Sequence, residues 1–233
     1  MNKARDVKNA LLKISSSARA LVSATFFKTG KGEYGEGDIF IGVTVPRQRE
    51  IARTFDALSL SAIMQLLKDR VHECRQTALI LLVDRFANAS LQEQRRIAGL
   101  YLSHTRWINN WDLVDMSARN IIGAYLFDTS RRPLYTLVLS KSLWERRIAI
   151  VATHYYIGKG ELKDTWKIAS LLLSDKEDLV HKATGWMLRE AGKKDRKALV
   201  TFLKKYHARM PRTMLRYAIK HCSRNDRRFW LGL

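Results

Sequence analysis

The chain has 233 residues, and 46% of them are hydrophobic, which is ordinary for a globular protein with a buried core. Its charge is not ordinary, because 42 Lys and Arg stand against 22 Asp and Glu and give a net charge of +20. A folded domain so far from neutrality repels itself, so a polyanionic partner explains the composition better than solubility alone.

Membrane, secreted and zinc proteins are disfavoured. No uninterrupted apolar stretch reaches the roughly 18 residues of a membrane span, and the N-terminus lacks the apolar run of a secretory signal. Cys74 and Cys222 have neither C-x-x-C spacing nor a histidine at a ligand interval, so we expect buried thiols and no metal or cofactor. We expect a cytoplasmic protein that is associated with the nucleoid and is monomeric by default.

The predicted elements are helices throughout. Residues 2–28 have apolar side chains near helical spacing and predict one amphipathic helix. The glycine-rich segment within residues 29–45 lacks the G-x-x-x-x-G-K-[ST] spacing of a nucleotide loop, so it is interpreted as a connector. Thr44 and Pro46 then indicate a helix start, with a capping hydroxyl before a proline in the first turn. Helical periodicity follows without sustained strand alternation, so the predicted fold class is all-α.

A repeat of 34 to 36 residues underlies the region from about residue 46 to about residue 225. Four similar local patterns carry a basic residue at one register: Arg75, Arg147, Lys182 and Arg216. These positions are 72, 35 and 34 apart, and Trp111 stands midway in the first gap, which is twice 36. The period predicts a single domain over residues 1–233, a curved solenoid of HEAT-like helix pairs with a basic concave groove.

Charge is concentrated near the C-terminus. Residues 193–228 contain 13 Lys and Arg but only two acids, Asp195 and Asp226, for a local net charge of +11. Contacts with phosphates explain why the positive charge is concentrated in this segment. Solubility alone would be served equally well by charges spread over the whole chain. A protein-interaction scaffold is the usual role of helical repeats, but it has little need of such a segment. The charge therefore favours a DNA partner.

Two helical faces combine indoles with charge. Trp111 and Asp115 are four residues apart and share a face. A carboxylate that faces phosphates weakens DNA binding, so its presence on this face indicates a functional role. A helix cap or an arginine partner explains the carboxylate equally well. Trp186 lies four residues after Lys182 and three before Arg189, which indicates either a DNA-facing stripe or core packing.

We find no Ser-His-Asp set, metal cluster or paired catalytic carboxylates in the sequence. The histidines are scattered, and His72 and His181 are interpreted as helix-terminal or groove residues rather than general bases. One carboxylate with two indoles is a sparse set, so it suits only a reaction with a good leaving group.

Several motifs in series resemble the AlkD family of alkylpurine DNA glycosylases. They span roughly residues 26 to 222 in the family's order and spacing. The matching segments are residues 37–43 running into Pro46, residues 109–115, residues 143–149, residues 182–190 and residues 210–219. Any one of these motifs is weak by itself, but the series is specific.

The resemblance implies a curved HEAT-like solenoid around duplex DNA, and hydrolysis of the N-glycosidic bond of cationic lesions such as 3-methyladenine and 7-methylguanine. By motif position, it places the catalytic carboxylate on Asp115, the indoles that pack on the lesion's deoxyribose on Trp111 and Trp186, and a phosphate contact on Arg147. The other expected phosphate contacts are Arg75, Lys182, Arg189, Arg212 and Arg216. A non-catalytic binder of DNA structures on the same scaffold is the alternative, because it does not require the carboxylate and the indoles together.

Overall fold

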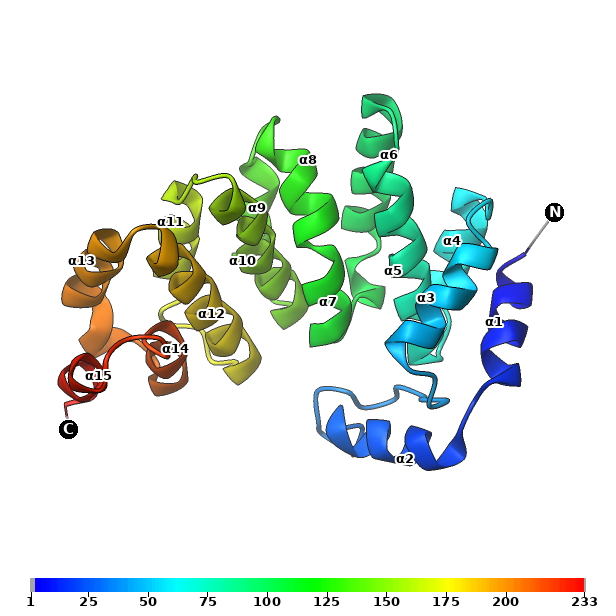
Figure 1. The fold of residues 1–233 in the computed structure, drawn as a ribbon, viewed down its shortest axis with the longest axis horizontal. Helices are drawn as coiled ribbons and strands as arrows, with labels where there is room; N and C mark the ends of the chain where they lie inside the picture. The colour runs from blue at the N-terminus through cyan, green and yellow to red at the C-terminus, as the bar shows by residue number, and fades with distance from the viewer. Residues whose placement is uncertain (1–2, 233) are drawn as a thin grey trace. The chain divides into compact units, whose positions relative to one another are not determined.

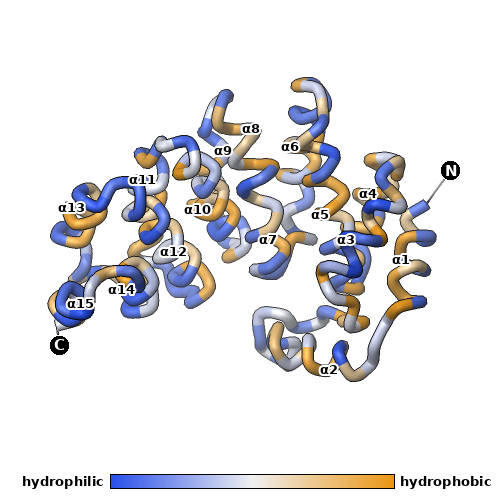
Figure 2. Tube along the Cα trace, viewed as in Figure 1, coloured by the Kyte–Doolittle hydropathy of each residue, from blue (hydrophilic) through white to orange (hydrophobic). Residues whose placement is uncertain are grey.

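The protein is described by a computed structural model that covers residues 3–232. These residues form helices and connecting segments without a named strand, which confirms the all-α prediction (Figure 1). Hydrophobic and hydrophilic residues alternate along most helices, as amphipathic packing requires (Figure 2). Within the described part of the chain, every helix is too short or too polar to cross a membrane.

The chain divides into two compact units, Met1–Ser117 and Ala118–Leu233. Unit 1 contains α1 (Ala4–Lys13), α2 (Ser17–Phe26), α3 (Val45–Thr54), α4 (Leu60–Leu67), α5 (His72–Ala87), α6 (Leu91–Ser103), the 3-10 turn η1 (Thr105–Trp107) and α7 (Trp111–Ser117). Helix α5 is its centre, because α1, α3, α4, α6 and α7 all pack against it. Every residue of α5 from His72 to Leu82 is buried.

The N-terminal region corrects one prediction, because residues 2–28 do not form a single helix. Residue 2 lies outside the described residues, and the rest divides into α1 and α2. The interruption lies in a run of serines, where Ser16 caps α2 by accepting a hydrogen bond from the Arg19 N–H at 3.5 Å. The Ser16 N–H also donates to the Ile41 carbonyl at 2.9 Å. A tertiary hydrogen bond and a cap therefore replace the continuous helix.

Residues 27–44 connect α2 to α3 without a helix. The buried carboxylate of Glu73 on α5 accepts hydrogen bonds from the N–H groups of Gly42 and Val43 at 2.7 and 3.3 Å. Gly42 has a φ of +76°, and a Cβ there would lie 2.2 Å from the Ser16 carbonyl oxygen. Only glycine combines this backbone conformation with so close an approach.

Helix α3 begins at Val45 with a proline in its first turn, as the sequence pattern predicted. Thr44 occupies the cap position, but its hydroxyl makes no capping hydrogen bond. The proline therefore contributes more to this boundary than the threonine, since its fixed φ suits the first helical turn and its missing N–H is not needed there.

Unit 2 contains the π-helical turn η2 (Arg119–Gly123), α8 (Ala124–Phe127), α9 (Arg132–Leu137), α10 (Leu143–Gly158), α11 (Lys163–Leu171), α12 (Asp178–Lys194), α13 (Arg196–Tyr206), the 3-10 turn η3 (His207–Arg209), α14 (Arg212–Ala218) and α15 (Arg224–Leu231). Helix α10 packs against η2, α8, α9, α11 and α12, and α12 packs against α13 and α14. Cys74 in unit 1 and Cys222 in unit 2 are buried free thiols, as predicted.

The four basic residues of the predicted repeat occupy similar places in their helices. Arg75 is the fourth residue of α5, whereas Arg147, Lys182 and Arg216 are each the fifth residue of α10, α12 and α14. Trp111 departs from this register, because it is the first residue of α7. The common place supports a repeating helical unit, while the solenoid curvature and the basic groove stay predictions.

Candidate nucleic-acid interface

Helix α7 carries two of the three predicted catalytic residues. Trp111 is its first residue, and Asp115 lies one turn later; both side chains are half-buried. The start of the helix is held locally, because the Trp111 N–H donates to Asn110 Oδ1 and the Leu113 N–H donates to Asp112 Oδ1, each at 2.8 Å. The sequence therefore sets the direction of α7 through two short polar side chains at its N-terminus.

Trp111 is packed among aromatic side chains of α2 and the connector. Its ring stacks on Phe27 at a centroid distance of 5.3 Å and meets the edge of Phe26 at 5.9 Å. Its indole N–H donates to the hydroxyl of Tyr34 at 3.3 Å. Phe26 is 62% exposed, so the aromatic cluster reaches the protein surface. Such stacked and edge-on contacts fix the orientation of the indole.

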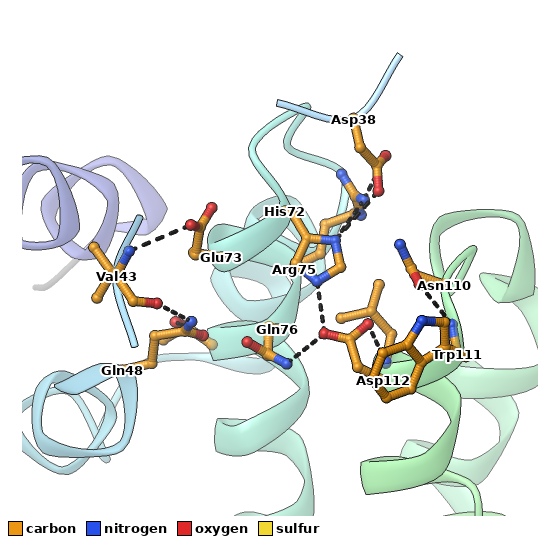
Figure 3. Close-up of polar contacts among 12 residues, drawn as sticks. Asp38, Val43, Gln48, His72, Glu73, Arg75, Gln76, Asn110, Trp111 and Asp112 are labelled. Atoms are coloured by element: carbon orange, nitrogen blue, oxygen red, sulfur yellow. Dashed lines mark hydrogen bonds and ion pairs between the residues drawn. The ribbon is translucent and has the colours of Figure 1, made fainter. Parts of the chain in front are cut away.

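A buried charged network (Figure 3) adjoins this cluster, because the His72 ring lies 5.2 Å from the Phe27 ring between centroids. His72, the first residue of α5, places Nε2 2.8 Å from Asp112 of α7 and Nδ1 3.2 Å from Asp38 of the connector. A carboxylate only accepts hydrogen bonds, so both ring nitrogens donate and the ring is an imidazolium. Gln76 also donates to Asp112 at 2.8 Å, and Arg75 donates to Asp38 at 2.7 Å.

The pKa values of this network follow from its contacts. Burial alone lowers the pKa of His72, but the hydrogen bonds that its ring donates to Asp112 and Asp38 outweigh burial and raise the pKa above 6.5. Burial alone raises the pKa of Asp38, but His72 and Arg75 outweigh it and bring the pKa below 3.8. Two cations thus offset two carboxylates, and the network joins α5, α7 and the connector.

His72, Asp38 and Asp112 are the residues that the sequence interpretation missed as a group. His72 is indeed helix-terminal, but its role as a buried cation was not anticipated. Asp38 and Asp112 both lie in motifs already singled out, at residues 37–43 and 109–115. Two acids in motifs and a histidine at a helix start are the only signal that the sequence offers for this network.

Two amide atoms beside Trp111 are buried without a hydrogen-bond partner among the described residues. They are Asn109 Oδ1 and Asn110 Nδ2, and Asn110 is fully buried. A buried polar atom without a partner costs free energy, so its retention calls for a reason other than stability. The start of α7 is therefore held in place by hydrogen bonds, and it also carries buried polar atoms that have no hydrogen-bond partner among the described residues.

Helix α12 of unit 2 carries the third predicted catalytic residue and two of the predicted cations. Trp186 is half-buried and meets the His154 ring edge-on at a centroid distance of 5.4 Å. Lys182 pairs with Asp178 at 2.8 Å, and Arg189 pairs with Glu190 at 3.1 Å. Both cations are partly exposed, so their side chains remain accessible from solvent.

Gly185, directly before Trp186, allows two helices of unit 2 to approach each other closely. A Cβ at Gly185 would lie 2.4 Å from the Met214 carbonyl oxygen and 2.5 Å from Tyr217 Cβ, both on α14. The close neighbour of Gly185 is therefore helix α14 of the same unit. Close packing of α12 against α14 places one face of α12 in the core and leaves Trp186 at its edge.

The remaining predicted phosphate contacts differ in exposure. Arg212 and Arg216 of α14 are exposed. Arg75 is 3% exposed, and its guanidinium is occupied by Asp38 and by two backbone carbonyls. Arg147 is 5% exposed and donates to the Leu179 carbonyl, which links α10 to α12. Internal partners hold the guanidinium groups of both Arg75 and Arg147, and the phosphate contacts of these two residues stay predictions.

No group of three or more metal-binding side chains gathers within residues 3–232. Among solved structures, the chain is similar to a predicted DNA alkylation repair enzyme from Enterococcus faecalis, with a TM-score of 0.69 and 16% sequence identity. The match covers 90% of this chain and 97% of that one, so the two share an all-helical fold. Curated proteins provide no match to the sequence.

The family is shown by the sequence itself. The DNA alkylation repair enzyme family matches residues 7–222, which is most of the chain. The protein therefore belongs to this family, as the motif series indicated. The matched range includes α7, the buried network around His72, and the Trp186 segment of α12.

Proposed function

We propose that this protein is a monofunctional DNA glycosylase that hydrolyses the N-glycosidic bond of cationic alkylated purines in duplex DNA. Membership of a DNA alkylation repair family and a net charge of +20 support DNA as the partner. The observation that carries the chemistry is the placement of Trp111 and Asp115 one turn apart on α7, on a helix whose start is fixed by a buried network.

The reaction needs little from the protein. N-alkylation gives the purine a positive charge, so the base leaves as a neutral molecule without a general acid. The electron pair of the breaking C–N bond goes to the base, and the sugar becomes an oxocarbenium-like cation. Asp115, ionised, stabilises that cation and orients the attacking water, which donates its oxygen to the anomeric carbon and releases a proton to solvent.

The indoles and the cations have separate roles in this proposal. Trp111 and Trp186 each offer an aromatic face to a developing positive charge, which is worth about 0.5–2 kcal/mol per ring. Lys182, Arg189 and the exposed arginines of α14 bind phosphates and set the register on the duplex. Because no lysine is assigned as a nucleophile, we expect base release without strand cleavage.

Substitution Asp115→Asn tests the proposal. It removes the charge that stabilises the sugar cation while keeping the shape of the side chain, so the release of 7-methylguanine from methylated duplex DNA should fall by about 10²-fold or more. Affinity for undamaged duplex should stay equal or improve, because an acid is removed from a surface that meets phosphates.

Asp84→Asn is the matched control, since Asp84 is an exposed carboxylate of α5. This variant should release base at the wild-type rate. If Asp115→Asn excises as fast as Asp84→Asn, the catalytic assignment is wrong. If the wild-type protein binds duplex DNA and releases no base from it, the protein is a non-catalytic DNA binder.

A further inference from the structure

Helix α15 lies beyond the part of the chain that matches the family, because the match ends at residue 222 and α15 spans Arg224–Leu231. Its boundaries are encoded locally. The Ser223 hydroxyl caps its start by accepting from the Asp226 N–H at 3.1 Å, and Gly232 ends it in the left-handed conformation with a φ of +65°. This helix is therefore a defined element and not a frayed end.

Two contacts anchor α15 to the rest of unit 2. Trp230 is 7% exposed and meets the His207 ring edge-on at 5.4 Å. Asp226, the acid of the helix, pairs with Arg196 of α13 at 2.9 Å. Asp226 and Trp230 thus both attach α15 to the rest of unit 2. The other charged residues of the helix take no part in this attachment.

Those remaining residues are all arginines. Arg224, Arg227 and Arg228 are exposed, and none of them forms an ion pair with another described residue. Arg224 and Arg228 are four apart, so their like charges lie on one face and destabilise the isolated helix. Binding of a polyanion offsets this repulsion between the arginines. A helix that faces only solvent gains nothing from such a cluster of like charges.

An exposed aromatic ring completes the surface. Phe229 is 74% exposed, which is unusual for so large an apolar side chain beside a cluster of charges. Phe229 and Arg212 of α14 line the same cavity of about 320 Å³. Arg212 is one of the predicted phosphate contacts, so a predicted DNA contact and an exposed apolar ring line one cavity.

We propose that α15 is an additional DNA-binding element, which contacts the sugar-phosphate backbone of the duplex. Arg224, Arg227 and Arg228 bind phosphates, and Phe229 packs on a deoxyribose beside Arg212. This proposal rests on the proposed DNA-binding function, but it does not depend on the excision chemistry. Phosphates match the three cations in charge, and a sugar ring next to a phosphate matches the apolar face of Phe229.

The test compares two triple variants in salt-dependent binding to undamaged duplex DNA. Arg224→Ala/Arg227→Ala/Arg228→Ala removes the charges of α15 and keeps its anchors. Each phosphate contact contributes about 0.9 to the slope of log K against log salt, so the slope should become shallower by about 3. The control variant removes three exposed cations of unit 1: Arg49→Ala/Lys68→Ala/Arg95→Ala.

The control changes the net charge equally but removes no proposed phosphate contact, so its slope should stay near that of the wild type. Equal slopes for the two triple variants would overturn the proposal, because the effect would then follow net charge alone. If wild-type protein shows no salt-dependent binding at all, the proposed DNA function fails as well. Wild-type binding with an unchanged slope in the α15 variant refutes only the assignment of α15.

A second variant isolates the aromatic ring. Phe229→Ala should weaken duplex binding a few-fold at constant salt slope, because loss of an apolar contact releases no counterions. Leu139→Ala is its control, since Leu139 is a similarly exposed apolar residue of unit 2 at 77% exposure. Equal affinities of the two variants would remove Phe229 from the contact surface.

A basic helix with an exposed aromatic ring also suits an anionic membrane surface. Sedimentation with vesicles of phosphatidylserine and phosphatidylcholine separates the two partners. We expect no difference between wild type and the α15 triple variant in this assay. Vesicle binding that is lost in the α15 variant, together with an unchanged DNA salt slope, would replace the DNA proposal by a membrane one.

Discussion

The two histidines beside the predicted catalytic tryptophans have opposite surroundings. His72 in unit 1 is buried between Asp38 and Asp112, which raise its pKa above 6.5 although burial opposes this. Near Trp186 in unit 2, burial lowers the pKa of His154, and the positive charge of Arg119 lowers it further. The surroundings of His72 therefore favour its charged form, and those of His154 favour its neutral form.

This difference shows two ways of placing an indole at a surface. In unit 1, a charged network ties the start of α7 to α5, and Trp111 is fixed next to it by stacked rings. In unit 2, close packing at Gly185 sets α12 against α14, and Trp186 takes its place at the edge of that contact. Charge pairing thus orders the first site, and steric packing orders the second.

The largest expected effect tests the charged network. His72→Leu leaves Asp38 and Asp112 without the imidazolium between them, so the free energy of unfolding should fall by about 3–5 kcal/mol. Urea denaturation measures this loss. His154→Leu is the comparison, because it removes an edge-on ring contact and leaves no carboxylate without a partner; we expect a loss of about 1 kcal/mol.

A double variant sharpens the result. Adding Asp112→Asn to His72→Leu removes one of the two carboxylates that lost their cation. The double variant should therefore lose less free energy of unfolding than the two single variants lose together. Additive losses would show that the imidazolium is not the partner on which Asp112 depends. Losses of equal size in His72→Leu and His154→Leu would break the contrast between the two units.

The next effect tests steric packing in unit 2. Gly185→Ala places a Cβ 2.4 Å from the Met214 carbonyl oxygen, so the helices must shift and the free energy of unfolding should fall by about 1–3 kcal/mol. Gly99→Ala in α6 is the matched control, because nothing lies within 4 Å of the position that a methyl group would take there. Alanine at that position should stabilise by about 0.5–1 kcal/mol. Stabilisation by both changes would contradict the packing role of Gly185.

The smallest effect concerns pH, where the two histidines should act in opposite directions. Because the pKa of folded His72 is raised above 6.5, its contribution to stability is fully present below pH 6.5 and is lost as pH rises through the folded pKa. Because the pKa of folded His154 is lowered, protonation of the unfolded chain destabilises the fold as pH falls below 6.5.

Urea denaturation of wild type, His72→Gln and His154→Gln on both sides of pH 6.5 checks this prediction. As pH rises, the advantage of wild type over His72→Gln should shrink, and the stability of wild type relative to His154→Gln should increase. Parallel pH profiles for the two variants would contradict the assigned protonation states.

The sequence was a good guide to local structure and a poorer guide to the interior. Period and cap chemistry predicted the all-α fold and the start of α3 at Val45. The single helix over residues 2–28 was wrong, because periodicity does not weigh a serine cap against helix continuation. The hydrogen bond from Ser16 to Ile41 joins two segments on either side of α2, so it leaves no local signal in the sequence.

The four basic residues at one register of the repeat show most directly that the sequence does not predict which side chains are buried. Arg75 and Arg147 are buried, Lys182 is half-buried, and Arg216 is exposed. Their positions in the helices are nearly the same, so the local sequence predicts a similar exposure for all four. Their neighbours decide the outcome, since Asp38 meets Arg75 and the Leu179 carbonyl meets Arg147.

By itself, the sequence determined the helical fold, the excess positive charge and the motif series that identifies a DNA alkylation repair protein, because all three are written in local spacing and composition. Only the tertiary structure decided that His72 is a buried cation. Asp38 precedes it by 34 residues and Asp112 follows it by 40, and a pairing over such separations exists only once the chain has folded.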